Sequence, residues 1–395
     1  MLVAIDAVGI RGHGGAAVLC ELLHWLPQVR RDWRWHVFLL DRDLREFDDP
    51  AVEGDVTFEH TRNGNSGLAR LRWVNSQLLK RLEEINPDVL LSFANIGSVK
   101  PSIPQIVFVQ QRYAFFSEGI PKNHFLMRLR MKFLKSKILA GAKNSNAVVV
   151  QTETMRKRML LCAPQLNGHI HVIPSGFRTL SVKPIIRPGV KEQIDSVKRP
   201  RLVYISLPRR YKNHITLIRA FINVLKIFPS ASLLLTEGRD DPYDRDMGKV
   251  KKDLKQEIQK LGISDHVLWF EWLSSNEVDY AHSASDLMIF PSFAESFGLP
   301  LAEAMSVGCP ILAADLPYAH EVAGDAAIYF NPYSPEDLAE RVISVLKSPE
   351  TLRNLVKLGK ERSVLFSYEK IANQFADIIQ KVVQGENSII EKQII

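Results

Sequence analysis

Two carboxylates stand eight residues apart in the stretch Phe290–Pro310, which reads FPSFAESFGLPLAEAMSVGCP. Glu295 lies in a predicted loop after a buried strand. Glu303 is placed in the first turn of the helix that follows, which ends at Gly308. A carboxylate can accept two hydroxyl hydrogen bonds at once, so this spacing suits a sugar at Glu295 and a ribose at Glu303.

Between the two carboxylates, Leu299-Pro300 opens the predicted helix with proline in its first turn. The backbone N–H groups of Phe297, Gly298 and Leu299 are therefore expected to point out of the helix N-terminus. Such groups bind phosphate, because the helix dipole places partial positive charge there. An ordinary strand, loop and helix with two surface carboxylates is the alternative.

A second candidate is the stretch Ser206–Ala220 (SLPRRYKNHITLIRA), which follows another predicted strand. Three cations near its start, Arg209, Arg210 and Lys212, can neutralise a diphosphate and stabilise it as a leaving group. A solvated basic turn or a nucleic-acid-binding patch is the alternative, and the sequence does not decide between Arg209 and Arg210.

Residues 11–16 read RGHGGA directly after the first predicted strand. The backbone at Gly14 and Gly15 can approach a phosphate or a sugar closely, because glycine has no side chain. A flexible turn explains the pattern equally well. The spacing is not that of a dinucleotide-binding loop, so no nicotinamide cofactor is expected.

Gln110 and Gln111 follow another predicted strand, and either amide can hydrogen-bond a sugar hydroxyl or simply cap the loop. Two Asp-x-Asp strings begin at Asp41 and Asp244. In each, Arg separates the carboxylates and no convincing strand with further ligands precedes them. We therefore expect no metal and no cofactor.

Short apolar runs alternate with helical patterns along most of the chain, which is typical of parallel sheets covered by helices on both faces. The pattern occurs twice, so we predict an α/β protein with two doubly wound, Rossmann-like domains facing a cleft. The predicted strands are Leu2–Ala7, Trp35–Leu40, Val89–Phe93, Ile106–Gln110, Ala147–Gln151, His169–Ile173, Arg201–Ser206, Ser232–Thr236, Val267–Phe270, Leu287–Phe290, Ile311–Ala313 and Ala327–Phe330.

Breaks in this pattern set the domain boundaries. The first domain is placed at 1–177 and the second at 201–367, with a linker at 178–200. An amphipathic helix over 368–385 is expected to cross back to the first domain, and 386–395 to form a tail.

Composition narrows the class of protein further. The chain of 395 residues is 46% hydrophobic with a formal net charge of +7, which suits a globular enzyme. The modest positive charge permits an anionic substrate or a membrane surface without requiring nucleic acid. Three scattered cysteines and the lack of a long apolar run lead us to expect a cytoplasmic protein. The basic, apolar segment 125–138 is either a peripheral contact with the inner face of the membrane or a buried helix with a solvated rim.

The Glu-x7-Glu spacing of Glu295 and Glu303 within ESFGLPLAEAM resembles glycosyltransferase family 4, whose members are retaining enzymes of the GT-B fold. The resemblance covers essentially the whole chain. It implies that Glu295 holds a donor sugar hydroxyl, that Glu303 holds the ribose, and that the backbone at 297–299 contacts the donor. It also matches Lys212 to the family's lysine.

Two positions depart from the family's pattern. An Arg usual before the lysine is replaced at Ser206 and Leu207, and a His or Asp usual near residue 110 is replaced by Gln110 and Gln111. The first departure leaves the diphosphate contact to Arg209 or Arg210, and the second makes the catalytic role of Gln110 an open question.

The resemblance implies a metal-independent, retaining glycosyltransferase that moves a hexose from a nucleotide-diphosphate donor to a glycan or lipid-linked acceptor. A bacterial polysaccharide or lipopolysaccharide pathway is the expected setting. Two alternatives stay open at this point: a nucleotide-sugar epimerase of the same fold, and a catalytically inactive sugar-binding or scaffold partner.

Overall fold

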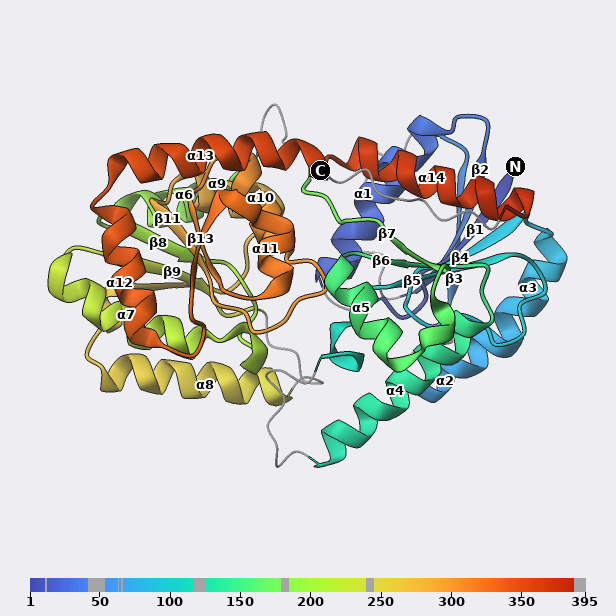
Figure 1. The fold of residues 1–395 in the computed structure, drawn as a ribbon, viewed down its shortest axis with the longest axis horizontal. Helices are drawn as coiled ribbons and strands as arrows, with labels where there is room; N and C mark the ends of the chain where they lie inside the picture. The colour runs from blue at the N-terminus through green and yellow to red at the C-terminus, as the bar shows by residue number, and fades with distance from the viewer. Residues whose placement is uncertain are drawn as a thin grey trace. The chain divides into compact units, whose positions relative to one another are not determined.

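The computed structural model describes residues 1–10, 13–41, 54–62, 64, 67–116, 125–178, 185–238 and 245–386. These residues form two compact units, drawn in Figure 1. Unit 1 contains the described residues up to Gly176 and those from Ser367 onward, and unit 2 contains those from Phe177 to Phe366.

Unit 1 is built on a seven-stranded sheet with the order β3-β2-β1-β4-β5-β6-β7, in which every neighbouring pair is parallel. Every residue of the three strands β4, β5 and β6 is buried, as expected for parallel strands covered on both faces. The strands are β1 (Leu2–Asp6), β2 (Arg34–Leu40), β3 (Val56–Thr61), β4 (Val89–Ser92), β5 (Gln105–Val109), β6 (Ala147–Val150) and β7 (Ile170–Val172).

Unit 2 has a six-stranded parallel sheet with the order β10-β9-β8-β11-β12-β13. Its four central strands are buried along their whole length. The strands are β8 (Arg201–Tyr204), β9 (Ser232–Thr236), β10 (Val267–Phe270), β11 (Leu287–Phe290), β12 (Ile311–Ala314) and β13 (Ala327–Phe330).

Helices lie between most consecutive strands of each sheet, as parallel pairing requires, and further helices precede or follow the strands of their unit. In unit 1 these are α1 (His13–Val29), α2 (Gly67–Arg72), α3 (Leu78–Ile85), α4 (Phe125–Lys143), α5 (Glu153–Cys162) and α14 (Tyr368–Gln384), and a π-helical turn, η2 (Trp73–Gln77), joins α2 to α3. In unit 2 they are α6 (Pro188–Ser196), α7 (His214–Ile227), α8 (Arg245–Lys260), α9 (Ser275–Ser283), α10 (Leu299–Val307), α11 (Pro317–Ala323), α12 (Pro335–Leu346) and α13 (Pro349–Ser363).

The predicted strands agree with the structure to within two residues at each end, but β3 was missed. This edge strand has no fully buried residue, so it lacks the continuous apolar run that marks the other strands. Its Glu59 is paired with His36 and Arg81 instead, at 2.9 and 2.8 Å.

The predicted linker at 178–200 is wrong over Pro188–Ser196, because these residues form helix α6 of unit 2. Pro188 opens the helix, and Ile194 is buried in the hydrophobic core of the unit. Arg187, just before the helix, donates from Nε to Glu277 at 2.7 Å.

Helix α14 returns the chain to unit 1 and lies beside α1 in Figure 1. Its buried face includes Ile371, Phe375 and Ile379, and the ring of Phe375 meets that of Phe108 edge-on at 5.2 Å. The first domain is therefore assembled from two segments far apart in the sequence.

Among the residues that the structure describes, no helix is both long and apolar enough to cross a bilayer.

Candidate active site

In unit 2 the strand order reverses direction between β8 and β11, which are hydrogen-bonded neighbours in the middle of the sheet. From β8 the chain moves outward through β9 and β10, and from β11 it moves outward through β12 and β13. The loops that leave β8 and β11 therefore diverge at the carboxyl edge of the sheet. Ligands of doubly wound folds bind at such a switch point.

The two loops bring Lys212 and Glu295 together. Lys212 Nζ lies 2.6 Å from Glu295 Oε1, and the same oxygen accepts from Ser292 Oγ at 2.6 Å. The side chains of Lys212 and Glu295 are only 13% and 10% exposed. An ion pair this poorly solvated is strong, so it holds the carboxylate in one orientation.

The loop after β8 is fixed by Asn213, which has the left-handed φ of 56°. Its buried amide donates to the carbonyl oxygens of Pro291 at 3.1 Å and Pro332 at 2.8 Å. The Tyr204 hydroxyl donates to the Lys212 carbonyl oxygen at 3.0 Å. These bonds tie the backbone around Lys212 to the loop after β11, to the segment after β13 and to the end of β8.

The loop after β11 is held in place by two further hydrogen bonds. The Phe293 N–H donates to the Tyr211 carbonyl oxygen at 2.7 Å, and the Tyr318 hydroxyl donates to the Ser292 carbonyl oxygen at 2.5 Å. Because Ser292 in turn donates to Glu295, both members of the ion pair sit on anchored backbone.

Helix α10 begins at Leu299, with Gly298 as its N-cap and Pro300 in its first turn, and ends at Gly308, as predicted. Gly298 has a φ of 99°, which only glycine adopts readily. Since glycine has no side chain to accept from the first-turn N–H groups, the positive end of the helix dipole is left for an outside anion. The Phe297 side chain packs on Phe366 in the core, so it is the backbone at 297–299 that can face a ligand.

Glu303 is the fifth residue of α10 and so lies in its second turn. The prediction that it lies in the first turn is therefore wrong. Burial raises the pKa of the Glu303 carboxyl to about 7; the Asp279 carboxyl of α9 adds to the rise and the Lys212 ammonium opposes it. Burial also raises the pKa of Asp279 to about 6, against the charge of Arg178. Near neutral pH Glu303 is therefore present in both protonated and ionised forms, so it can donate to or accept from a hydroxyl group.

Arg209 and Arg210 immediately precede Lys212. Arg209 caps a short 3-10 turn, η5 (Arg210–Lys212), and both arginines are partly exposed. Three cations and two carboxylates thus gather around one switch point, an arrangement that can bind a polar ligand with both anionic and hydroxyl groups.

The other predicted site residues belong to unit 1. Gln110 follows β5, where its N–H donates to Asn95 Oδ1 at 2.6 Å, and Gln111 accepts from the Tyr113 N–H at 3.3 Å. Gly14 and Gly15 lie in the first turn of α1 rather than in a loop, which corrects the prediction for these two residues. Helix α1 begins at His13; residues 11 and 12 lie outside the described ranges.

The switch point of unit 1, between β1 and β4, carries a buried ion pair. Arg70 donates to both oxygens of Asp6 at 2.8 and 2.6 Å, and Trp73 Nε1 donates to the same carboxylate at 3.0 Å. Asp6 is fully buried, so its carboxylate interacts with groups of unit 1 and not with solvent. This pair therefore stiffens the edge of the sheet.

Of the two Asp-x-Asp strings, Asp41 is described and accepts from Arg62 Nε at 3.0 Å, whereas residues 42, 43 and 244 lie outside the described ranges. Within those ranges no three His, Cys, Asp or Glu side chains gather as a metal site would need.

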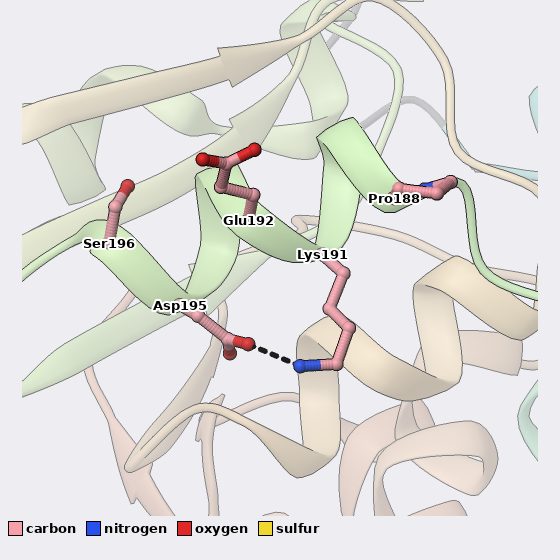
Figure 2. A pocket seen from close by; sticks show the side chains of 5 residues that line it. All are labelled: Pro188, Lys191, Glu192, Asp195 and Ser196. Atoms are coloured by element: carbon pink, nitrogen blue, oxygen red, sulfur yellow. Dashed lines mark hydrogen bonds and ion pairs between the residues drawn. The ribbon is translucent and has the colours of Figure 1, made fainter.

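Unit 2 also has a shallow hollow along α6, shown in Figure 2. Lys191 and Asp195 on its wall form an ion pair of 2.6 Å with one another. The residues that line the hollow lie on one helix, and no predicted site residue is among them. The switch point is therefore the stronger candidate site.

Known proteins resemble this chain in sequence and in fold. Residues 190–362 match the model of a family described as Glycosyl transferases group 1. The O-antigen chain mannosyltransferase RfbU of Salmonella typhimurium is 28% identical over 136 residues, which are 34% of this chain and 36% of that protein. The alpha-monoglucosyldiacylglycerol synthase of Streptococcus pneumoniae is 26% identical over 324 residues, 78% of this chain and 69% of that protein. Of the first four curated relatives, three are matched over less than half of their own length.

Solved structures match over nearly the whole chain. The sucrose-phosphate synthase of Thermosynechococcus elongatus superimposes with a TM-score of 0.74 at 17% identity, covering 98% of this chain and all of that one. Anabaena HepE in complex with UDP-glucose gives a TM-score of 0.73 at 17% identity, covering 96% of this chain and all of that one.

The fold is therefore GT-B, with two doubly wound parallel sheets, as the sequence predicts. The match of residues 190–362 to the glycosyl transferases group 1 model confirms the resemblance seen in the sequence.

Three residues that shape the site escaped the sequence analysis: Ser292, Asn213 and Asp279. Ser292 and Asn213 act through hydrogen bonds between loops far apart in the sequence, which no local pattern reveals. Asp279 is one of many acidic residues on helices, and only its place near Glu303 distinguishes it.

Proposed function

We propose that this protein is a retaining glycosyltransferase that transfers a hexose from a nucleoside diphosphate sugar to an acceptor hydroxyl, without a metal ion. The observation that carries the proposal is the Lys212–Glu295 pair, at a switch point beside the N-terminus of α10. The site offers cations for a diphosphate and carboxyl groups for sugar hydroxyls within one unit.

In the proposed reaction, the bond between the anomeric carbon and the leaving phosphate oxygen breaks as the acceptor oxygen attacks the same face of the sugar. The acceptor's proton passes to the departing diphosphate, so no protein nucleophile is needed. Lys212, Arg209 or Arg210, and the N–H groups at the start of α10 would offset the charge that develops on the diphosphate. Glu295 would hold a donor sugar hydroxyl and Glu303 the ribose.

Two relatives support this choice of chemistry. HepE has been solved with UDP-glucose bound, and RfbU is named as a mannosyltransferase of the O-antigen chain. We therefore propose a nucleotide-linked hexose as donor and a growing polysaccharide or lipopolysaccharide glycan as acceptor. Gly14, Gly15 and Gln110 of unit 1 remain candidates for contacts with donor or acceptor.

A thermal-shift panel tests the donor site. UDP-, GDP-, ADP-, CMP- and dTDP-linked sugars are added to the wild type and to Glu303→Ala, with the exposed Glu340→Ala as matched control. A ligand at about 100 times its Kd stabilises the native state by about 2.7 kcal/mol. We expect one nucleotide class to raise the Tm of the wild type and of Glu340→Ala, and to lose most of that effect in Glu303→Ala.

An equal shift in all three proteins would overturn the assignment of Glu303. The absence of a shift with every donor would favour an inactive partner instead. Product analysis separates the remaining alternative, since an epimerase changes the donor without any acceptor. Activity that EDTA abolishes and Mg²⁺ restores would contradict the metal-independent mechanism.

A further inference from the structure

Helix α4 of unit 1 carries large apolar side chains on its outer face. Phe125, Leu129 and Phe133 are 72%, 53% and 48% exposed. They follow one another at intervals of four residues, so they form a single stripe along the helix. In the second half of the helix, Ile138 and Ala142 on the opposite face are buried against the unit. In Figure 1 the first half of α4 extends past the other helices of unit 1.

Cations border this stripe on both sides. On a helix of 3.6 residues per turn, Arg128 and Lys132 fall along one side of the stripe, and Arg130 and Lys137 along the other. The helix has six cations and no carboxylate over its whole length. The outer face of α4 therefore carries an apolar stripe with cations along both of its sides.

Two contacts show how the cations are arranged around the apolar surface. Lys137 Nζ lies 5.1 Å from the centre of the Phe133 ring, so its aliphatic stem runs beside the aromatic side chain. Lys135 Nζ lies 3.8 Å from Cys162 Sγ, at the end of α5. The neighbouring Leu161 is 80% exposed, so the apolar and basic surface continues onto α5.

We propose that α4, with the end of α5, docks this protein onto a membrane surface that contains anionic lipids. An apolar stripe between two rows of cations matches a bilayer interface, where acyl chains take up the apolar side chains and lipid phosphates lie at the level of the cations. A second copy of the same face would bring cations against cations, and a nucleic acid would leave the apolar stripe exposed. This inference does not depend on the transfer reaction proposed above.

Vesicle co-sedimentation of the full chain tests the proposal, without donor or acceptor present. Phosphatidylcholine vesicles with about a third phosphatidylglycerol are compared with pure phosphatidylcholine at low and high salt. We expect binding to the anionic vesicles at least about tenfold tighter than to neutral ones, and weakened by salt.

Two triple variants separate the apolar and electrostatic parts. Phe125→Ser/Leu129→Ser/Phe133→Ser removes the stripe, and Arg128→Glu/Arg130→Glu/Lys132→Glu reverses three charges; the charge reversal is expected to weaken binding about 100-fold or more. The matched controls in unit 2 are Ile227→Ser/Val364→Ser/Leu365→Ser, three other exposed apolar residues, and Lys249→Glu/Lys252→Glu/Lys260→Glu on α8. Both controls should bind vesicles as the wild type does.

Far-UV circular dichroism checks that each variant is folded. The proposal is overturned if the folded wild type ignores anionic vesicles, or if the α4 variants bind no worse than their controls. Sedimentation equilibrium that shows a dimer lost in the Ser variant, without vesicle binding, would assign the surface to a second copy instead.

Discussion

Lys212 Nζ and Glu295 Oε1 lie 2.6 Å apart although 83 residues separate them in the sequence. Both side chains are largely shielded from water, so each charge depends on the other for its stabilisation. The ammonium group is therefore held in place before any ligand arrives. A bound diphosphate would add to an electrostatic arrangement that already exists, which is how preorganised sites stabilise developing charge.

The first prediction concerns this pair. Lys212→Met should lower the turnover of sugar transfer by roughly 10²–10³, because one stabilising cation is lost from the leaving group. Glu295→Gln should lower turnover with little change in donor affinity. Single-turnover kinetics of both variants and of the double variant measure the coupling, and additive losses would contradict a functional pair.

Asn213 allows conformational strain to be separated from hydrogen bonding. Asn213→Ala loses the bonds to Pro291 and Pro332 and places a β-carbon in the left-handed region, so it should lower the free energy of unfolding by roughly 2–4 kcal/mol. Asn213→Gly loses the same bonds without the strain, and should be milder by about 1 kcal/mol. Urea denaturation compares them, and equal losses would mean that the φ of 56° carries no cost.

The raised pKa of Glu303, about 7, makes stability depend on pH. Between the ordinary carboxyl pKa and pH 7, the unfolded chain releases a proton that the folded protein keeps. Stability therefore falls as the pH rises through this interval and is level above it. Glu303→Gln should remove this slope, a change on the order of 2 kcal/mol after allowance for partial exposure.

Thermal unfolding from pH 4.5 to 8 measures that effect, with Glu340→Gln as an exposed control on the same background. A slope that persists in Glu303→Gln but disappears in Asp279→Asn would show that Asp279, with its pKa near 6, holds the proton instead.

His282 is predicted to make the fold sensitive to acid. It is fully buried, neither ring nitrogen has a hydrogen-bond partner among the described residues, and burial lowers its pKa to about 4. As the pH falls from 6.5 to 4, His282 takes up a proton in the unfolded chain but stays neutral in the native state. The free energy of unfolding therefore falls over this interval. His282→Leu should be at least as stable at pH 7 and should avoid a loss of up to about 3 kcal/mol at pH 4. Matching acid denaturation curves for wild type and variant would contradict this.

The buried Asp6–Arg70 pair of unit 1 can be tested by removing its charges one at a time and together. Arg70→Met leaves the Asp6 carboxylate buried without its cation, and should cost about 3–5 kcal/mol. Asp6→Asn/Arg70→Met keeps an acceptor for Trp73 and removes the unpaired charge, so the double variant should be more stable than the single one. Guanidinium denaturation followed by Trp fluorescence distinguishes the two; a double variant that is the less stable would rule out the charge as the cause.

The sequence predicted those parts of the fold that depend on local patterns. Strands such as β8 and β11 are continuous apolar runs, and α10 is bounded by Pro300 and Gly308, so each could be placed within a residue or two. Strand β3 was missed because an edge strand buries too little to show a pattern. Helix α6 was missed although Pro188 marks its first turn, because the charged residues around it are also typical of a linker.

The site was predicted only in its parts. Glu295 and Lys212 were chosen because their surroundings resemble a family's motifs. No local pattern in the sequence indicates that the two side chains form an ion pair. The roles of Ser292 and Asn213 depend on loops meeting across the edge of a sheet, which is a tertiary property. The error in counting the turns of α10 has a simple cause: the helix starts at Leu299, which makes Glu303 its fifth residue.

Helix α14 has a consequence for the order in which this chain can fold during synthesis. Every residue of unit 2 leaves the ribosome before α14 does, yet α14 covers part of unit 1, where Phe375 packs on Phe108. The domain begun first is therefore completed last, in contrast to the usual N-terminal-first order. The apolar surface of unit 1 that α14 covers therefore stays exposed while the whole of unit 2 is synthesised. A chain stopped at Phe366 should accordingly lose unit 1 to limited proteolysis while unit 2 survives.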